Sequence, residues 1–503
     1  MSQKYVKKIL DARIYDLALE TPVDSAPLLS QRLKNNILLK REDLQPVFSF
    51  KLRGAYNKLL QLSQNQLSAG VIAASAGNHA QGLALAAKKM DVLATIVMPK
   101  TTPQIKVDAV RARGAKVILS GDSFDDANAC AIKLVEEHGM TYIHPFDDPD
   151  IIAGQGTIGM EILRQLPGNL DAIFIAVGGG GLCAGVAAYV KHIRPGIKII
   201  AVESNDAACL DAAMKAGRRV RLKEVGLFAD GTAVGQIGKE TFRILKDLVD
   251  EVITVSTDEI CAAIKDVYND TRAICEPSGA MGVAGLKKYV KHHSLSGKTL
   301  LSIQCGANID FDRLRYISER TEIGEKREAI LAVTLEERPG SFKNFCQALD
   351  KRTISEFNYR FSDSDEAQIF VGVKVSSDEN RFDMVRELSE LGYRVSDMTD
   401  SAIAKSHIRH MVGGRSSQVG EEQVFRLEFP ERPGALLNFL KQLGNRFNIS
   451  MFHYRNHGSA FGKVLVGFQA SKEDGLKVKE FLDNSGYSYE DETNNEAYRF
   501  FLG

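Results

Sequence analysis

From about residue 20 to residue 320, short apolar runs alternate with alanine-rich segments in which apolar positions follow a helical period. The apolar runs have the length and composition of strands buried on both faces of a parallel sheet. The helical segments include 80–89 and 105–113, and each ends near a glycine or a change of pattern. This alternation predicts doubly wound parallel sheets, which bind ligands at the carboxyl ends of their strands. The apolar runs are residues 70–74, 92–99, 116–119, 172–177, 198–202 and 299–304.

After residue 320 the alternation stops, and two stretches of the chain repeat one another. Four short motifs recur in the same order at a spacing of 94 or 95 residues. Each copy has the pattern strand, turn, helix, strand, strand, helix, strand, which predicts a duplicated ferredoxin-like α+β fold. The paired motifs are Glu337-Arg338-Pro339-Gly340 with Glu431-Arg432-Pro433-Gly434, Asn358-Tyr359-Arg360 with His453-Tyr454-Arg455, Phe370–Val373 with Leu465–Phe468, and Gly392-Tyr393 with Gly486-Tyr487.

The 503 residues are therefore expected to form an α/β part followed by two smaller units. Residues 1–320 form the α/β part, with open twisted sheets in two lobes. The smaller lobe, about residues 53–150, is inserted into the larger one. A charged linker is expected at 321–328, and the two repeat copies at 329–402 and 423–503.

Composition narrows the classes of function. Lys plus Arg and Asp plus Glu both number 64, so no net charge recruits nucleic acid or an anionic membrane. No stretch approaches the roughly 20 apolar residues of a membrane span, and the first residues lack an apolar signal-peptide segment. The seven cysteines are scattered without a CxxC pair, so neither a metal site nor a disulfide framework is predicted. We expect a cytoplasmic protein with reduced thiols and small-molecule ligands.

The first candidate for chemistry is Lys51, which lies between Phe50 and Leu52 just before a helical run. Its apolar neighbours would partly desolvate the ammonium group. Burial lowers the pKa of a lysine and favours the neutral amine that Schiff-base chemistry requires. Most lysines at helix starts are solvated, so on this evidence alone an ordinary surface lysine remains an alternative.

The second candidate is the turn after the apolar run 70–74. Small residues at a strand-to-helix turn leave backbone N–H groups free at a helix amino terminus, where a carboxylate or phosphate can bind. Asn78 adds a neutral side-chain donor, and His79 is interpreted as structural rather than as a general base. An ordinary capped turn would have a similar composition. The residues of this turn are Ser75, Ala76, Gly77, Asn78 and His79.

The third candidate is a run of four glycines between the apolar run 172–177 and Leu182. Because glycine has no Cβ, its backbone can approach and surround a phosphate. The sequence therefore predicts a phosphate-binding loop at this position. The four residues are Gly178, Gly179, Gly180 and Gly181.

The same glycines permit a second interpretation. The spacing Gly179-x-Gly181-x-x-Ala184 fits a dinucleotide-binding pattern, and Glu203 lies where a ribose-binding acid would follow. A dinucleotide-dependent oxidoreductase is therefore an alternative. It leaves Lys51 without a role and places the fingerprint near the middle of the α/β part.

One cofactor would use all three candidates. Pyridoxal phosphate carries an aldehyde, a ring hydroxyl, a ring nitrogen and a phosphate, and the residues after the run 299–304 could face its ring nitrogen. The segments SFKLRGA, ASAGNHAQG, GGGGL and CGAN, in that order, resemble the fold-type II pyridoxal-phosphate lyases. The resemblance is strongest to the biosynthetic threonine deaminases, which carry the same duplicated C-terminal region. It extends from about residue 5 to residue 503.

This resemblance implies a two-lobed catalytic domain like the tryptophan synthase β subunit, followed by two ACT-like regulatory domains. It also implies roles for individual residues. Lys51 carries the cofactor, Phe50 packs against it, Asn78 contacts its ring oxygen, Gly178 to Gly181 and Leu182 hold its phosphate, Cys305 faces its ring nitrogen, and Ser75, Ala76 and Gly77 hold the substrate carboxylate.

Cys305 departs from the family pattern, in which serine is the most familiar residue at this position. A thiol is a weaker hydrogen-bond donor than a hydroxyl, but both are neutral. A neutral partner keeps the carbanion short-lived and favours β-elimination over transamination.

The resemblance implies deamination of L-threonine to 2-oxobutanoate and ammonia, the first committed step of isoleucine biosynthesis, with L-serine as a secondary substrate. It also implies a homotetramer in which isoleucine inhibits and valine activates through the C-terminal domains. Tyr359 and Tyr454 are candidate effector contacts, although sheet-core aromatic residues would fit equally well. The remaining alternatives are another fold-type II enzyme (serine dehydratase, serine racemase or a threonine synthase-like enzyme) and a non-catalytic amino-acid sensor.

Overall fold

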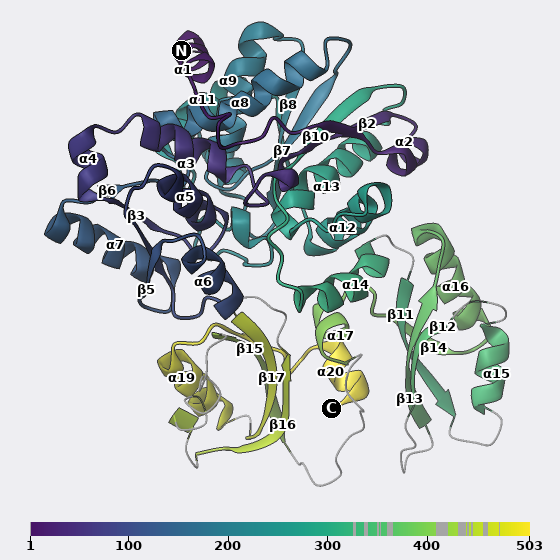
Figure 1. The fold of residues 1–503 in the computed structure, drawn as a ribbon. Coiled ribbons are helices and arrows are strands. Elements are labelled where there is room, and N and C mark those ends of the chain that lie inside the picture. The colour runs from purple at the N-terminus through teal and green to yellow at the C-terminus, as the bar shows by residue number, and fades with distance from the viewer. Residues whose placement is uncertain are drawn as a thin grey trace. The chain divides into compact units, whose positions relative to one another are not determined.

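The protein is represented by a computed structural model, shown in Figure 1. Two compact units are present, Met1–Phe311 and Asp312–Gly503. The structure describes residues 2–324, 328–336, 341–349, 352, 354–359, 366–408, 421–430, 439, 442–443, 446–455, 461–471 and 473–502.

The larger lobe of the first unit is built on a six-stranded sheet with the order β1-β2-β10-β7-β8-β9 (Figure 1). Neighbouring strands are parallel except for β1 and β2. Every residue of β7 is buried, as a strand covered on both faces requires. The strands are β1 (Val23–Ser25), β2 (Asn36–Arg41), β7 (Ala172–Ala176), β8 (Lys198–Ser204), β9 (Glu251–Val255) and β10 (Thr299–Gln304).

The smaller lobe is built on a four-stranded parallel sheet with the order β5-β4-β3-β6. All four strands fall between β2 and β7 in the chain, so the lobe is an insertion into the larger one. The strands are β3 (Val71–Ala74), β4 (Ala94–Met98), β5 (Lys116–Leu119) and β6 (Thr141–Tyr142).

Local sequence explains several helix starts in this unit. Helix α7 follows a capping box formed by Ser123 and Asp126, and α12 follows one formed by Ser256 and Glu259. The helices are α1 (Ser2–Leu10), α2 (Pro27–Leu33), α3 (Lys51–Leu60), α4 (Gln64–Ala69), α5 (Asn78–Lys89), α6 (Gln104–Arg111), α7 (Phe124–His138), α8 (Pro149–Gln165), α9 (Gly181–Ile193), α10 (Cys209–Ala216), α11 (Lys239–Leu248), α12 (Thr257–Thr271) and α13 (Pro277–His292), with short 3-10 turns η1 (Glu42–Leu44) and η2 (Asp230–Thr232).

The second unit starts with α14 (Arg313–Gly324), so residues 321–324 of the expected linker are helical. The first repeat copy then forms an antiparallel sheet with the order β12-β13-β11-β14. Its elements are β11 (Glu328–Glu336), α15 (Ser341–Ala348), β12 (Ile354–Tyr359), β13 (Glu366–Lys374), α16 (Asp378–Glu390), β14 (Arg394–Asp397) and α17 (Ala402–Ser406).

The second copy has the same strand order, β16-β17-β15-β18, and this order is the ferredoxin-like one in both copies. Its register shift, between Ile449 and Met451, lies 95 positions after the shift between Ile354 and Glu356 in the first copy. The predicted duplication is confirmed. The elements are β15 (Glu422–Pro430), β16 (Asn448–Arg455), β17 (Phe461–Gln469), α19 (Gly475–Ser485), β18 (Tyr489–Asp491) and α20 (Glu496–Phe501).

Some sequence predictions concern residues outside the described part of the chain. The two Arg-Pro-Gly turns, 338–340 and 432–434, lie there, as do the side chains of Tyr359 and Tyr454. The backbones of the two tyrosines are described and occupy matching places in β12 and β16. None of the helices described has both the length and the apolar composition needed to cross a membrane.

Candidate active site

Lys51 is the first residue of α3, and the chain just before it pairs with the chain just after β10. The backbone N–H of Phe50 donates a hydrogen bond to the carbonyl of Cys305 (3.3 Å), and Ser49 forms an antiparallel bridge with Gly306. These contacts bring Lys51 and Cys305 together at the carboxyl end of the large sheet. Parallel sheets bind their ligands at this edge.

Lys51 as a whole is partly exposed, but its side-chain amine lies among protein groups. Its Nζ donates a hydrogen bond to the carbonyl of Pro145 (3.1 Å) and lies 5.3 Å from the centre of the Phe50 ring. Burial lowers the pKa of Lys51 to about 8, although Cys305 and Glu276 oppose this shift electrostatically. A substantial fraction of the amine is therefore neutral close to physiological pH, as a nucleophilic or basic lysine requires.

Asn78, the first residue of α5, has its side-chain amide held from both sides. Its Nδ2 donates a hydrogen bond to Glu276 Oε1 (2.6 Å), and its Oδ1 accepts one from Asn308 Nδ2 (2.7 Å). The amide orientation is thereby determined, and one N–H of Asn78 remains to bind another group. Burial, reinforced by Asp230, raises the pKa of Glu276 to about 7.

The turn between β3 and α5 presents backbone N–H groups beside Asn78. The N–H of Gly77 donates to Ser75 Oγ (3.3 Å), and all three turn residues, Ser75, Ala76 and Gly77, are partly exposed. Helix α5 packs directly on the start of α3, since a Cβ at Gly82 would lie 3.0 Å from the backbone N of Leu52. The turn and Lys51 therefore belong to one site.

The four glycines connect β7 to α9 and are all buried. Gly180 has a φ of 91°, in the left-handed region that glycine tolerates. A Cβ at Gly179 would lie 2.2 Å from the Phe146 ring, so this position has no room for a larger residue. Among the described residues, no group accepts a hydrogen bond from the backbone N–H of Gly179, Gly180 or Gly181. Buried amides without acceptors are suited to an anionic ligand.

Cys305 is a buried thiol at the end of β10. Its Sγ donates a hydrogen bond to the carbonyl of Ser278 (3.2 Å) in the first turn of α13. Burial raises the pKa of Cys305, so the thiol stays protonated and neutral.

Comparison with known proteins decides the family. Residues 14–306 match the family described as pyridoxal-phosphate dependent enzymes, and residues 319–408 and 413–502 both match the C-terminal regulatory domain of threonine dehydratase. The chain is 53% identical to the biosynthetic L-threonine dehydratase of Burkholderia multivorans, covering 100% of this chain and 99% of that protein. The chain belongs to the threonine dehydratase family. It is a pyridoxal-phosphate-dependent enzyme with C-terminal regulatory domains.

Other relatives agree with this threonine dehydratase assignment. The Escherichia coli biosynthetic L-threonine dehydratase is 52% identical, with 99% of this chain and 97% of that protein covered. A solved structure of threonine deaminase isoform 2 from Solanum lycopersicum has a TM-score of 0.63 and 50% identity, covering 64% of this chain and 88% of that one. A crystal structure of the T.th. threonine deaminase has a TM-score of 0.57 and 38% identity, covering 61% of this chain and 99% of that one.

Sequence reasoning assigned no specific role to three residues that contact this candidate site, although Asn308 lies in the CGAN segment that resembles the family. Glu276 and Asn308 both contact Asn78, and Phe146 packs on Gly179. The residues around Phe146 follow β6, and Asn308 follows β10. Their position could have suggested a role for Phe146 and Asn308, because polar and aromatic residues just after parallel strands often line a ligand site.

His79 and Glu203 have structural roles in this threonine dehydratase family protein. His79 is buried, its Nε2 is hydrogen-bonded to the carbonyl of Ile143 (2.9 Å), and burial lowers its pKa to about 3. This geometry agrees with the prediction that His79 is structural rather than a general base.

The buried carboxylate of Glu203 accepts hydrogen bonds from the backbone N–H groups of Leu210 and Asp211, both at 2.8 Å. Glu203 therefore caps α10, and a dinucleotide ribose would have no access to it.

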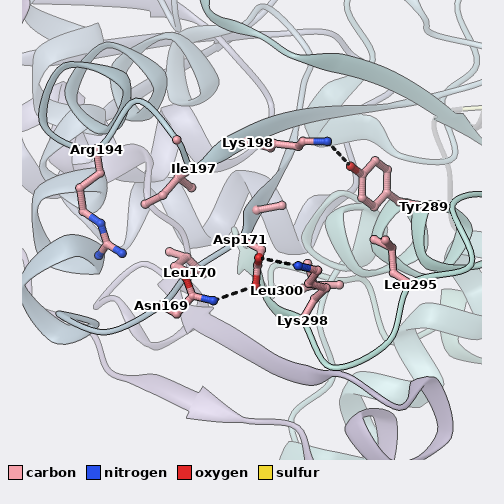
Figure 2. A pocket seen from close by; sticks show the side chains of 12 residues that line it. Asn169, Leu170, Asp171, Arg194, Ile197, Lys198, Tyr289, Leu295, Lys298 and Leu300 are labelled. Carbon is pink, nitrogen blue, oxygen red and sulfur yellow. Dashed lines mark hydrogen bonds and ion pairs between the residues drawn. The ribbon is translucent and has the colours of Figure 1, made fainter.

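A separate cavity of about 450 Å³ lies at the amino ends of β7, β8 and β10 (Figure 2). Asp171 and Lys298 form an ion pair on one side, and Lys198 donates to the hydroxyl of Tyr289 on another. None of the sequence-predicted residues of the threonine dehydratase site line this cavity.

Proposed function

We propose that this chain removes water from L-threonine by β-elimination and releases 2-oxobutanoate and ammonia, the first committed step of isoleucine biosynthesis. The observation that carries the proposal is the partly buried amine of Lys51, with its pKa lowered to about 8, beside the Asn78 amide and the Cys305 thiol. The full-length similarity to biosynthetic threonine dehydratases supports threonine as the substrate.

The residues present fit pyridoxal phosphate. Lys51 would hold the aldehyde carbon, the backbone of Gly178 to Gly181 with Leu182 would hold the phosphate, and Phe50 would pack against the ring. Asn78 would donate its remaining N–H to the ring oxygen, and Cys305 would face the ring nitrogen. When bound, the cofactor supplies an electron sink for the negative charge that develops at the substrate Cα.

The chain's own residues then orient the substrate and move its protons. The turn of Ser75, Ala76 and Gly77, at the amino terminus of α5, binds the substrate carboxylate. The N–H of Ser75 already donates to the carbonyl of Val97 (3.1 Å), so the backbone donors are those of Ala76 and Gly77. The neutral amine of Lys51 takes the proton from the substrate Cα. Because Cys305 is neutral, it would leave the ring nitrogen of the bound cofactor unprotonated, which favours loss of the β-hydroxyl. Serine lacks one methyl group, a difference that discriminates by only about 10–200-fold, so it is a secondary substrate.

The test replaces Lys51 with Ala and uses Lys89→Ala, an exposed lysine at the end of α5, as the matched control. We expect Lys51→Ala to lose both the visible absorbance of the bound cofactor and the formation of 2-oxobutanoate from threonine. Lys89→Ala should retain both. Full turnover in a folded Lys51→Ala variant would refute the assignment.

We further propose that the second unit binds branched-chain amino acids, with isoleucine as inhibitor and valine as activator. The two matches to a threonine dehydratase regulatory domain support this role. Tyr359 and Tyr454, at matching backbone positions in the two copies, are the proposed effector contacts. A chain ending at Phe311 should turn over threonine without responding to isoleucine, whereas strong inhibition of that chain would contradict the proposal.

A homotetramer in the cytoplasm is the proposed state of the enzyme. Zero net charge offers little electrostatic resistance to self-association. Light scattering coupled to gel filtration measures the assembly directly, and a monomer at micromolar concentration would contradict it.

A further inference from the structure

Three potential metal ligands converge at the edge of the large lobe opposite Lys51. Glu251 is the first residue of β9, His292 is the last residue of α13, and His293 follows it. His293 Nε2 lies 3.2 Å from Glu251 Oε2. One ligand atom from each of the three residues lies within 4.8 Å of the other two.

We propose that Glu251, His292 and His293 form a binding site for zinc, with water as the fourth ligand. Bonds of about 2.0–2.1 Å from tetrahedral zinc place neighbouring ligand atoms roughly 3.3–3.4 Å apart. The Glu251–His293 separation of 3.2 Å already matches this value. His292 needs to approach by about 1.5 Å at most, and its exposed side chain at a helix end can rotate to do so.

The surroundings favour a cation at this place. The carbonyl end of α13 carries partial negative charge, which stabilises positive charge beside its last turn. The His293 ring packs on the ring of Tyr289 with 4.2 Å between centres, and Tyr289 is buried. The hydroxyl of Tyr289 accepts a hydrogen bond from Lys198 in the cavity of Figure 2. One ligand is thus held in place before the metal binds.

The donor set determines which metal binds. Two imidazoles and a carboxylate suit zinc, nickel or copper, whereas magnesium and calcium prefer oxygen ligands alone. The 16 residues of α13 span roughly 24 Å, and its opposite end contacts Cys305 through Ser278. Zinc at the His292 end would therefore join β9 to α13 without touching the reacting groups. The site does not depend on the proposed reaction.

The test is a calorimetric titration of the untagged, full-length holoenzyme with zinc chloride, and separately with magnesium chloride. The variants are His292→Ala, His293→Ala and Glu251→Gln, and the control is His138→Ala, an exposed histidine at the end of α7. We expect each of the three variants to lose one zinc equivalent or to bind it roughly tenfold more weakly or worse. The control should bind zinc as the parent does, and magnesium should not bind at these residues.

A second measurement separates loss of the site from misfolding. Zinc should raise the melting temperature of the parent and of His138→Ala but not that of His292→Ala, because a ligand stabilises only a state that binds it. Without zinc, all the proteins should melt alike and turn over threonine alike. Equal zinc affinity in the parent and in all three ligand variants would overturn the proposal.

Discussion

The side-chain amide of Asn78 donates a 2.6 Å hydrogen bond to Glu276, which links the first turn of α5 to the residue that precedes α13. The bond connects the small lobe to the large lobe beside Lys51. Because Asn308 donates to the other end of the same amide, the remaining N–H of Asn78 has one direction available. Glu276 therefore affects the site both as a hydrogen-bond acceptor and as a negative charge near Lys51.

Replacing Glu276 with Gln should shift the pH dependence of cofactor attachment to lower pH. The negative charge of Glu276 raises the pKa of Lys51, so its removal leaves the amine neutral at lower pH. A pH titration of the visible absorbance that appears when apoenzyme binds pyridoxal phosphate measures the shift.

Glu203→Gln is the control for this shift. Burial also raises the pKa of Glu203 to about 7, but Glu203 is not among the charged groups that shift the pKa of Lys51. In the folded parent protein, the carboxyl groups of Glu203 and Glu276 hold their protons more tightly than they do in the unfolded chain, because both pKa values are raised. The free energy of unfolding contributed by either group therefore falls as the pH rises from about 4.5 to about 7. Both variants should lose this slope, but only Glu276→Gln should move the attachment curve. A similar movement in both would contradict a direct effect on Lys51.

Gly179→Ala should damage the glycine loop. The new Cβ would lie 2.2 Å from the Phe146 ring, and overpacking of this kind costs about 1–3 kcal/mol. Chemical denaturation should show this loss, and equilibrium dialysis should show weaker cofactor binding. At Gly168 no heavy atom lies within 4 Å of an added Cβ, so Gly168→Ala should change stability by less than about 0.5 kcal/mol. Equal effects at the two positions would argue against a tightly packed loop.

Cys305→Ser should retain the reaction. A hydroxyl can replace the thiol as a neutral donor to the carbonyl of Ser278, and burial keeps the Cys305 thiol neutral. We expect kcat/KM for threonine to change by about tenfold or less, equivalent to roughly 1.4 kcal/mol. Cys183→Ser, at a buried position in α9, provides the comparison. A loss of several thousandfold at Cys305 alone would show that the reaction needs the sulfur itself.

Arg53→Met should destabilise the first turn of α3. The guanidinium of Arg53 is completely buried and pairs with Glu42 (2.7 Å) and Glu161 (2.5 Å). Its removal leaves the buried carboxylate of Glu42 without its ion-pair partner and leaves Glu161 paired only with Lys40, and breaking a buried pair in this way costs about 3–5 kcal/mol. Arg111→Met is the comparison, because the contact of Arg111 with Asp108 is exposed and 3.7 Å long. This substitution should lower the free energy of unfolding by less than about 1 kcal/mol. Urea denaturation measures both, and a small effect at Arg53 would contradict its structural role.

Much of the fold was predictable because its signals are local. The apolar run 70–74 became β3 (Val71–Ala74), and the amphipathic segment 80–89 became most of α5 (Asn78–Lys89). The duplicated motifs after residue 320 correctly predicted two ferredoxin-like sheets. The chemical candidates were also local, since Lys51, the Asn78 turn and the glycine loop each follow a recognisable change of pattern.

Local patterns were enough to predict many of the elements, the duplication and the residue types available for chemistry, because side-chain period and turn composition act over a few neighbouring residues. Which distant residues meet depends instead on the tertiary fold. Strand pairing and helix packing bring together residues that are far apart in the sequence. The pairs are Glu276 with Asn78, Cys305 with Phe50, and Glu251 with His293. Burial then set the protonation of Lys51 and Glu276, and no pattern along the chain encodes the solvent access that causes those shifts.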